Sequence, residues 1–367
     1  MRFPEFSGEW NKYTINDLAT VVGGGTPDTT VKSYWGGDIQ WFTPSEIGKN
    51  KYVDFSKRTI TRDGLDNSSA KLLPLHTILL SSRATVGECS IASNECTTNQ
   101  GFQSLIAKQC NIDFLYYLIQ TKKKDLIRNA CGSTFLEISA NEIRKIKVAV
   151  PVQNEQEQIA KLLSLIDERI ATQNKIIEDL KKLKSAITDL LFHSIADAHT
   201  IRLGKIAHIT NGAGDVQDAN TEHQEDWYPF FDRSEELKWF PTYSFDKEAV
   251  IYAGEGQSFY PRYYNGKFAL HQRCYAITDF ASCIIPKYCY HFMNTLNSYF
   301  VRNSVGSTVP SLRMDIFQKV EIRLPPIPKQ QHICKIIDAF YTKLEVEQRG
   351  ISILQELKQF LLSQMFI

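Results

Sequence analysis

The chain has 367 residues, of which 43% are hydrophobic and 23% charged, and its formal net charge at pH 7 is +1. This length suits two globular domains with connections, and the balanced charge gives no whole-chain electrostatic argument for a nucleic-acid partner. No run of eighteen apolar residues occurs and the first residues lack the layout of a secretory signal, so we expect a cytoplasmic protein without membrane contact. Eight cysteines without a Cys-x-x-Cys pair predict reduced core residues and no metal site.

The first region, 1–150, contains short β-type segments such as HTILLSS, separated by clusters of Gly, Pro and Asn. This pattern predicts a mixed α/β domain. Its glycine-rich segment GGGTPDTT lacks the ending of a phosphate-binding loop, and we interpret it as a turn that closes the first helix. The candidate phosphate or base contacts of this region are Ser82, Arg83 and Gln100.

The segment 151–196 predicts one long amphipathic helix. From Asn154 to Phe192 it would extend ~58 Å at ~1.5 Å per residue, which is a length typical of a spacer. Apolar residues recur at alternating steps of three and four, as in a heptad seam, with Gln173 and Lys184 as polar interruptions. The main apolar seam residues are Ile159, Leu163, Ile166, Ile170, Ile177 and Leu180.

The next region, 197–324, has the same mixed α/β character, with strand-like segments such as EAVIYAG. Its beginning, LGKIAHITNGAGD, is similar to INDLATVVGGGTP of the first region. Four side chains are candidate DNA contacts here because basic and amide groups lie among aromatics and turn residues. They are Arg262, Lys267, Gln272 and Arg273. An ordinary core with outward charges would explain the same composition.

The last segment, 325–367, repeats the first long helix without insertion, at a constant difference in residue number (325 − 151 = 174). Its seam residues are Ile333, Ile337, Phe340, Leu344, Ile351 and Leu354. Two matched helices in one chain predict that they pair with each other. We expect an antiparallel pair, because the single connection at about 193–200 is too short to return the chain along ~58 Å. Apolar residues outside the seam, such as Leu162 and Ile176, are either contacts for partner proteins or additional packing within the pair.

Catalytic motifs are missing from the sequence. It contains no phosphate-binding loop, Rossmann glycine motif, nucleophile elbow, zinc-protease motif or Asn/Asp-Pro-Pro-Tyr motif. The histidines do not fall at metal-ligand spacings. We therefore predict a non-catalytic chain without cofactor or metal.

Two divergent domains, each followed by a nearly interchangeable long helix, resemble the specificity subunit of type I restriction-modification systems. The resemblance rests on GGGTP, YWGGDIQWFTPSEI, NQGF and the Pro-x-x-x-x-Gln-Gln/Glu-x-Ile motif that begins both helices. It implies target recognition domains at 1–150 and 197–324, each recognising one half of a bipartite double-stranded DNA target. It also implies spacer helices at 151–196 and 325–367, two methyltransferase subunits as partners, and restriction subunits.

The second domain departs from this pattern, because NGAGDVQD stands in place of GGTP and the YWGG segment is missing. Two alternatives therefore stay open. One is a DNA-binding regulator built on the same scaffold without methyltransferase partners. The other is an interaction scaffold whose domains bind peptides or glycans.

Overall fold

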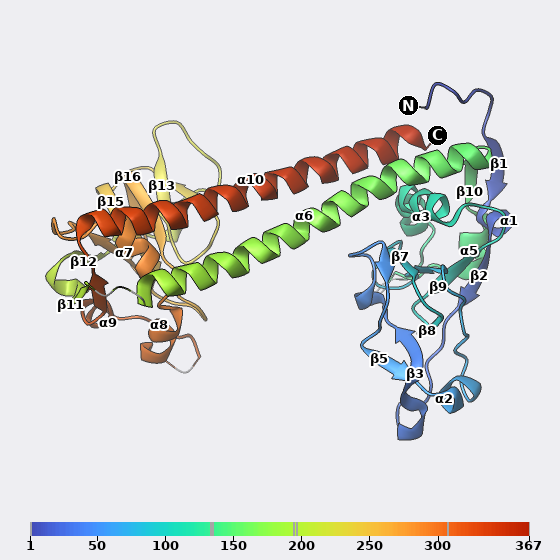
Figure 1. The fold of residues 1–367 in the computed structure, drawn as a ribbon, viewed down its shortest axis with the longest axis horizontal. Helices are drawn as coiled ribbons and strands as arrows, with labels where there is room; N and C mark the ends of the chain where they lie inside the picture. Colours follow the sequence, from blue (N-terminus) through green and yellow to red (C-terminus); the bar gives the residue numbers. More distant parts are fainter. Residues whose placement is uncertain (1, 133–135, 194, 196, 307, 367) are drawn as a thin grey trace. The chain divides into compact units, whose positions relative to one another are not determined.

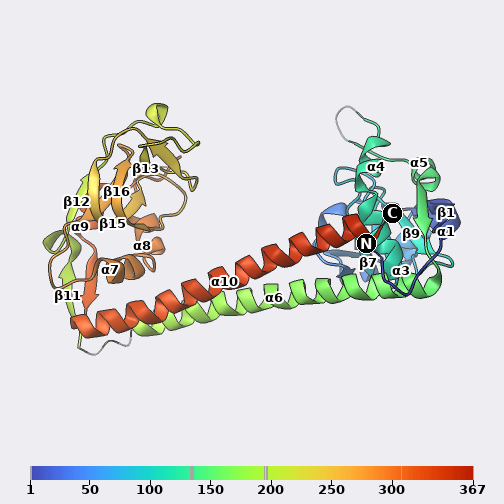
Figure 2. The same ribbon diagram turned by 90° about the horizontal axis from the view of Figure 1, so that it is seen from above.

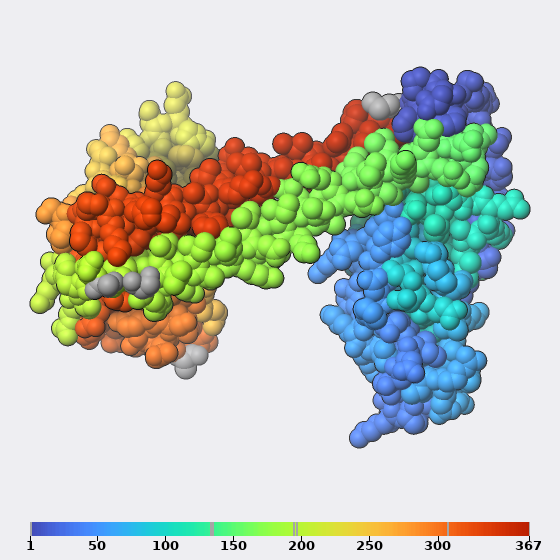
Figure 3. Space-filling model, viewed as in Figure 1, coloured from blue at the N-terminus to red at the C-terminus, as the bar shows by residue number. Residues whose placement is uncertain are grey.

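The computed structural model describes residues 2–132, 136–193, 195, 197–306 and 308–366. The chain forms two compact units: unit 1 comprises Met1–Ile176 with Glu347–Ile367, and unit 2 comprises Ile177–Val346. Each unit contains a mixed α/β domain and part of two long helices, α6 (Gln153–His193) and α10 (Ile327–Met365) (Figure 1). In Figure 3 the atoms of α6, in green, lie against those of α10, in red. None of the helices described has the combination of length and apolar composition that a membrane span requires.

Unit 1 is built on three small sheets with strand orders β2-β9-β6-β7-β4, β5-β3-β8 and β1-β10. The strands are β1 (Asn11–Thr14), β2 (Ala19–Gly23), β3 (Trp35–Phe42), β4 (Tyr52–Val53), β5 (Arg58–Ile60), β6 (Ile78–Leu80), β7 (Cys89–Ala92), β8 (Cys96–Thr98), β9 (Gln103–Ala107) and β10 (Lys147–Val150). The helices besides α6 and α10 are α1 (Ile15–Leu18), α2 (Arg62–Asp66), α3 (Ile112–Thr121), α4 (Lys123–Arg128) and α5 (Ala140–Lys145), with 3-10 turns η1 (Lys32–Tyr34) and η2 (Pro44–Glu46).

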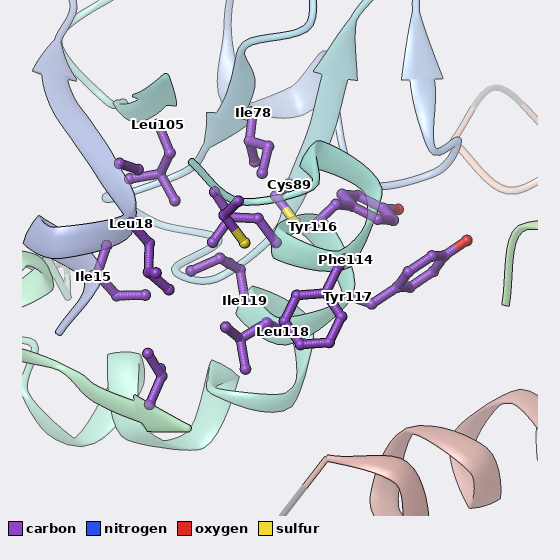
Figure 4. Close-up of a cluster of buried hydrophobic side chains, with 14 of the residues drawn as sticks. Ile15, Leu18, Ile78, Cys89, Leu105, Phe114, Tyr116, Tyr117, Leu118 and Ile119 are labelled. Atoms are coloured by element: carbon purple, nitrogen blue, oxygen red, sulfur yellow. The ribbon is translucent and has the colours of Figure 1, made fainter. Parts of the chain in front are cut away.

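Helix α3 occupies the centre of the unit 1 core (Figure 4). All six residues 114–119 are buried, which is the pattern of a helix covered on every side. The same cluster contains Ile78 and Leu105 from the sheet and Leu163 from α6. Helix α3 therefore joins the domain to the long helices through apolar packing.

Unit 2 has a six-stranded sheet of order β12-β17-β15-β16-β13-β14 and the pair β11-β18. The strands are β11 (His199–Arg202), β12 (His208–Asn211), β13 (Tyr228–Phe231), β14 (Lys238–Phe240), β15 (Phe245–Ala253), β16 (Arg262–Leu270), β17 (Cys274–Thr278) and β18 (Glu321–Leu324). The shorter helices are α7 (Pro286–Met293), α8 (Asn297–Asn303) and α9 (Met314–Gln318), with 3-10 turns η3 (Leu203–Lys205) and η4 (Val216–Asp218).

The internal repeat predicted from the sequence is confirmed by the order of the shared strands. The order β2-β9-β6-β7 of unit 1 is matched by β12-β17-β15-β16 of unit 2. The antiparallel pair β1-β10 is matched by β11-β18, and the differences in numbering are 199 − 11 = 188 for the first strands and 321 − 147 = 174 for the second. The segments inserted between these matched elements differ, so the frame is shared while the loops are not.

One glutamine anchors the beginning of each long helix. In unit 1 the Gln156 amide donates to the Pro151 carbonyl at 2.9 Å and its oxygen accepts from the Asn111 N–H at 3.0 Å, at the cap of α3. In unit 2 Gln330 bonds to Pro325 and to the Ile285 N–H at the cap of α7, each at 2.9 Å. The Gln of the sequence motif therefore ties each long helix to a domain helix.

Helices α6 and α10 lie side by side within each unit (Figures 1 and 2). In unit 1 the first part of α6 shares a core with the last part of α10, whereas in unit 2 the last part of α6 shares a core with the first part of α10. The helices are therefore antiparallel. Of the predicted seam residues, Ile159, Leu163, Ile166, Ile177, Ile333, Ile337 and Leu344 are buried and Ile170, Leu180, Phe340, Ile351 and Leu354 are half-buried.

The lysine in the seam of each long helix has a partner on the opposite helix. In unit 1 the Lys358 ammonium lies 2.7 Å from the Asp167 carboxylate. At the repeat-equivalent place in unit 2 the Lys184 ammonium lies 4.1 Å from the ring centroid of Tyr341. The repeat-equivalent lysines are therefore held by an ion pair in unit 1 and by a cation–π contact in unit 2.

Two expectations from the sequence need correction. The GGGTP segment follows strand β2, not a helix, because Ala19 is already extended and β2 pairs with β9. Six of the eight free cysteines are buried as predicted, but Cys131 and Cys283 are exposed. Of the two apolar residues outside the seam, Leu162 packs against the unit 1 core, whereas Ile176 is exposed.

Candidate nucleic-acid interface

In unit 1 two of the loops singled out from the sequence meet at the end of the five-stranded sheet. The Gly25 N–H donates to the Thr98 carbonyl at 2.8 Å, and the Thr26 hydroxyl donates to the side-chain oxygen of Gln100. A Cβ atom on Gly24 would lie 2.1 Å from the Asn99 carbonyl oxygen. The absence of a side chain at Gly24 therefore allows the GGGTP and NQGF loops to touch. Gln100, in the second of these loops, is exposed.

Tryptophans from β3 support this arrangement. The Trp41 indole N–H donates to the Gly25 carbonyl at 2.9 Å. The Arg58 guanidinium lies 3.6 Å from the Trp35 ring centroid, and the two tryptophan rings meet edge to face. The YWGGDIQWF segment is therefore joined to the GGGTP loop by a side-chain hydrogen bond.

Unit 2 builds the same contact without that motif. The Gly214 N–H donates to the Leu270 carbonyl at 3.0 Å, and the Gln272 N–H donates to the Gly214 carbonyl at 3.1 Å. A Cβ on Gly212 would lie 2.0 Å from the Leu270 carbonyl oxygen. Phe230, stacked on Phe240 at a centroid distance of 5.0 Å, lies under this loop in place of the tryptophans.

A third loop joins each cluster and carries a charged residue. In unit 1 the Ser82 N–H donates to the Gly101 carbonyl at 2.8 Å, and the next residue, Arg83, pairs with Glu137 at 2.6 Å. In unit 2 the Gly254 N–H donates to the Arg273 carbonyl at 2.9 Å, and the next residue is Glu255.

The unit 2 cluster borders a cavity of about 300 Å³. Its lining residues are Val216, Asp232, Arg233, Glu255, His271, Gln272, Arg273 and Cys274. Burial by itself would raise the pKa of Asp232, but the Lys238 ammonium at 2.7 Å and the Ser234 N–H outweigh it and hold that pKa below its usual value. The cavity therefore has an ionised carboxylate in its wall at neutral pH.

The structure brings together some of the candidate residues and separates others. Arg83 and Gln100 lie in the unit 1 cluster, and Gln272 and Arg273 lie in the unit 2 cluster. Lys267 is exposed on β16, with its ammonium 4.7 Å from the Tyr243 ring centroid, and does not line the cavity. It stays a candidate phosphate contact outside the cluster.

The surroundings of two candidate DNA contacts argue against a direct contact with a ligand. Ser82 is fully buried, so its hydroxyl is not available to a ligand. The Arg262 guanidinium is half-buried and donates to the backbone carbonyls of Asp232 and Ser234. Arg262 therefore shapes the 232–234 loop and is not retained among the candidate contacts.

Sequence reasoning missed Glu137 and Glu255, which pair with Arg83 and Arg273, and also Arg233, which lies 3.7 Å from Glu255. One signal could have found Glu255, because its distance in numbering from Arg83 (255 − 83 = 172) equals that between Gln272 and Gln100 (272 − 100 = 172). Among the residues that the structure describes, no group of three or more His, Cys, Asp or Glu side chains is placed to hold a metal ion.

Solved structures with the same fold cover 98–100% of this chain. The S subunit of the type I restriction-modification system of M. genitalium superposes with a TM-score of 0.64 at 17% identity, covering 100% of this chain and 99% of that one. A chain from a structural study of complex assembly in the type I R-M system gives a TM-score of 0.63 at 14% identity, with 98% of each chain covered.

Sequence relatives include two specificity subunits of type I restriction enzymes. The specificity subunit of the type I restriction enzyme MjaIX of Methanocaldococcus jannaschii is 28% identical over 97% of this chain and 92% of its own length. That of EcoR124I/EcoR124II of Escherichia coli is 28% identical over 50% of this chain and 46% of its own length. The family model described as type I restriction modification DNA specificity domain matches residues 7–182 and 196–359. The chain therefore belongs to the type I restriction-modification DNA specificity family.

Proposed function

We propose that this chain is the non-catalytic specificity subunit of a type I restriction-modification complex in the cytoplasm, and that each unit recognises one half of a bipartite double-stranded DNA target. The observation that carries the proposal is the pair of loop clusters, one per unit, built on the same backbone contacts with different side chains. A shared frame places both clusters at the same end of their sheets. Different side chains on that frame suit two unrelated half-site sequences.

The groups at the two clusters suit the chemistry of base and phosphate recognition. Gln100 and Gln272 are exposed, and an amide can donate to and accept from the edge of adenine. Arg83 and Arg273 are partly exposed, and a guanidinium can donate two hydrogen bonds to guanine. These four residues are the proposed sequence-reading set.

Methylation and cleavage are assigned to partner subunits, with two methyltransferase subunits and restriction subunits joining this chain. An exposed apolar stripe on α10 supports a docking surface for a methyltransferase subunit. Ile353, Leu357 and Phe360 follow one helix face at four- and three-residue steps and are 65%, 42% and 51% exposed. Leu183 on α6 is the repeat equivalent of Leu357 (357 − 183 = 174) and is 49% exposed, so each unit presents one such position.

The test is methylation by the assembled complex. The chain is co-expressed with the methyltransferase subunit of a type I system, and the methylome of the host is sequenced. The expected result is adenine methylation at one bipartite motif, with no methylation by the purified chain alone. Binding of the complex to duplex DNA should weaken steeply with salt.

Two outcomes would favour the alternatives. Salt-dependent DNA binding without any association with a methyltransferase would indicate a regulator. Absence of DNA binding by the complex would indicate an interaction scaffold for other ligands.

A further inference from the structure

Glu255 holds two arginines at the edge of unit 2. Its side chain is 18% exposed, and its two carboxylate oxygens lie 2.7 Å from Arg273 and 3.7 Å from Arg233. The arginine side chains are 65% and 72% exposed, respectively. The carboxylate is thus partly buried while both guanidinium groups face outward beside the cavity of about 300 Å³.

The backbone fixes the carboxylate in this place. The preceding residue, Gly254, donates its N–H to the Arg273 carbonyl at 2.9 Å and accepts from the Leu312 N–H at 2.7 Å. Glu255 itself forms an antiparallel β-bridge with Ser311. Two segments distant in sequence therefore determine where the carboxylate meets Arg273.

Unit 1 has the same backbone with the opposite charge. Arg83 occupies the position of Glu255 and forms the equivalent β-bridge with Glu137, which is the repeat equivalent of Ser311 (311 − 137 = 174). Arg83 and Glu137 also form an ion pair of 2.6 Å. An Arg–carboxylate pair is thus present at the same place in both frames, but the arginine stands on a different loop in each.

Stability is a weak explanation for these pairs, because each arginine side chain is at least 46% exposed and an ion pair with a solvent-exposed guanidinium contributes little to folding. A carboxylate close to a polyanion also costs repulsion. It has an advantage when it holds a guanidinium in one geometry, since a pre-oriented arginine loses less freedom on binding and presents two parallel donors.

Building on the proposed function, we propose that Glu255 is a positioning residue that orients Arg273 to recognise one guanine in the half-site bound by unit 2. The Arg83–Glu137 pair holds the corresponding place in unit 1. The loop that carries the arginine then decides which base of each half-site is recognised. Arg233, which is farther from Glu255 and more exposed, contacts a backbone phosphate.

The first test uses the complete methyltransferase complex with single variants of this chain. Arg273→Lys keeps the charge and the partner Glu255 but loses the two parallel donors. We expect discrimination at one base pair of one half-site to fall on the order of 10-fold or more. Glu255→Gln should relax the same base pair to a smaller extent, whereas Glu137→Gln, the matched control, should affect only the other half-site.

A charge swap separates positioning from a merely structural role. The variant combines Glu255→Arg and Arg273→Glu with Arg233→Ala, so that no like charges face each other. If the pair were only structural, the rebuilt ion pair would preserve the methylated motif. We expect the methylated motif to change at one base pair of one half-site. The variant protein should keep the melting temperature of the wild type.

Methylome sequencing of strains carrying each complex supplies the readout, together with binding to duplexes that carry the wild-type motif. An unchanged motif in Arg273→Lys and Glu255→Gln would overturn the inference while leaving the proposed function intact, and so would changes in both half-sites. Uniformly weaker binding in Arg233→Ala, with the motif unchanged, is expected for a phosphate contact. A wild-type complex that methylates no bipartite motif would overturn the proposed function itself.

Discussion

Two glycines permit the loop contacts on which the proposed interface depends. Gly24→Ala would place a Cβ 2.1 Å from a backbone oxygen, and Gly212→Ala would place one at 2.0 Å. Because a backbone atom cannot move aside easily, we expect each change to destabilise its unit by about 1–3 kcal/mol. Chemical denaturation measures this loss of unfolding free energy.

Gly350→Ala is the matched control for these glycines. Gly350 lies in α10, and a Cβ there would meet no atom within 4 Å. Alanine is the better helix former, so this variant should gain about 0.5–1 kcal/mol. Gly24→Ala or Gly212→Ala variants as stable as the wild type would contradict the close contact.

His291 gives unit 2 a dependence of stability on pH. Its ring is buried, its Nε2 lies 2.9 Å from Asp338, and burial lowers its pKa despite that carboxylate, with Lys287 and Lys184 adding to the decrease. The folded state therefore binds a proton less readily than the unfolded state. Stability contributed by the neutral ring is present above the unfolded pKa of about 6.5 and is lost as pH falls through the lower folded value.

The His291→Gln variant tests this assignment, because glutamine can donate a hydrogen bond to Asp338 but does not titrate. Melting temperatures are compared at pH 7.5 and pH 5.5. The wild type should lose more stability on acidification than the variant. Equal losses in the two proteins would show that another group accounts for the dependence.

At the scale of elements, the two anchoring glutamines join each long helix to its domain. Gln156→Ala and Gln330→Ala would each leave one buried carbonyl and one partly buried N–H without these partners, at a cost of about 1–3 kcal/mol. Amide hydrogen exchange should become faster at the start of α6 in the first variant and of α10 in the second. Gln158→Ala is the control, because Gln158 is exposed on α6. It should leave hydrogen exchange unchanged at the start of both helices.

Substitutions in the exposed apolar stripe of α10 should weaken partner binding and leave folding intact. Ile353→Ser and Phe360→Ser replace side chains that contribute little to the core, because both are more than half exposed. We expect each to weaken association with the methyltransferase on the order of 10-fold, as measured by titration calorimetry. Leu75→Ser alters a similarly exposed leucine that is not part of α6 or α10, and it should leave association unchanged.

For the whole molecule, the paired helices should act as the ruler between half-sites. Half-sites recognised from one side of a duplex lie ~10–10.5 base pairs apart from centre to centre. Removing one heptad from both α6 and α10, at positions that keep the antiparallel seam in register, shortens the pair by about 10 Å. The unread spacer should then shrink by about three base pairs at ~3.4 Å each, with both half-site sequences retained.

Methylome sequencing checks the ruler and the modular arrangement in one experiment. Exchange of 1–150 for the recognition domain of a relative should change one half-site only. A shortened chain that keeps the wild-type spacer would contradict the ruler. An exchange that alters both halves would contradict independent recognition.

Much of this architecture could be predicted from the sequence because its signals are local. The helix seam follows from apolar residues at steps of three and four, and the same spacing appears in both copies, α6 and α10. Gln156 and Gln330 belong to a short motif at a helix start, so their position required no knowledge of distant contacts. The duplication itself is visible as a constant difference in numbering between equivalent residues of the two helices (330 − 156 = 174).

Only the tertiary structure decided which residues make up the proposed interface. Residues 19–23 form a strand, not part of a helix, because they pair with β9, which comes much later in the sequence. Ser82 is buried and Arg262 is engaged by carbonyls, neither of which composition reveals. Glu137 and Glu255 become partners of arginines through β-bridges between segments that are distant in sequence. Periodicity along the chain determines helices and their seams, whereas the identity of neighbours across a sheet edge depends on how distant segments are paired.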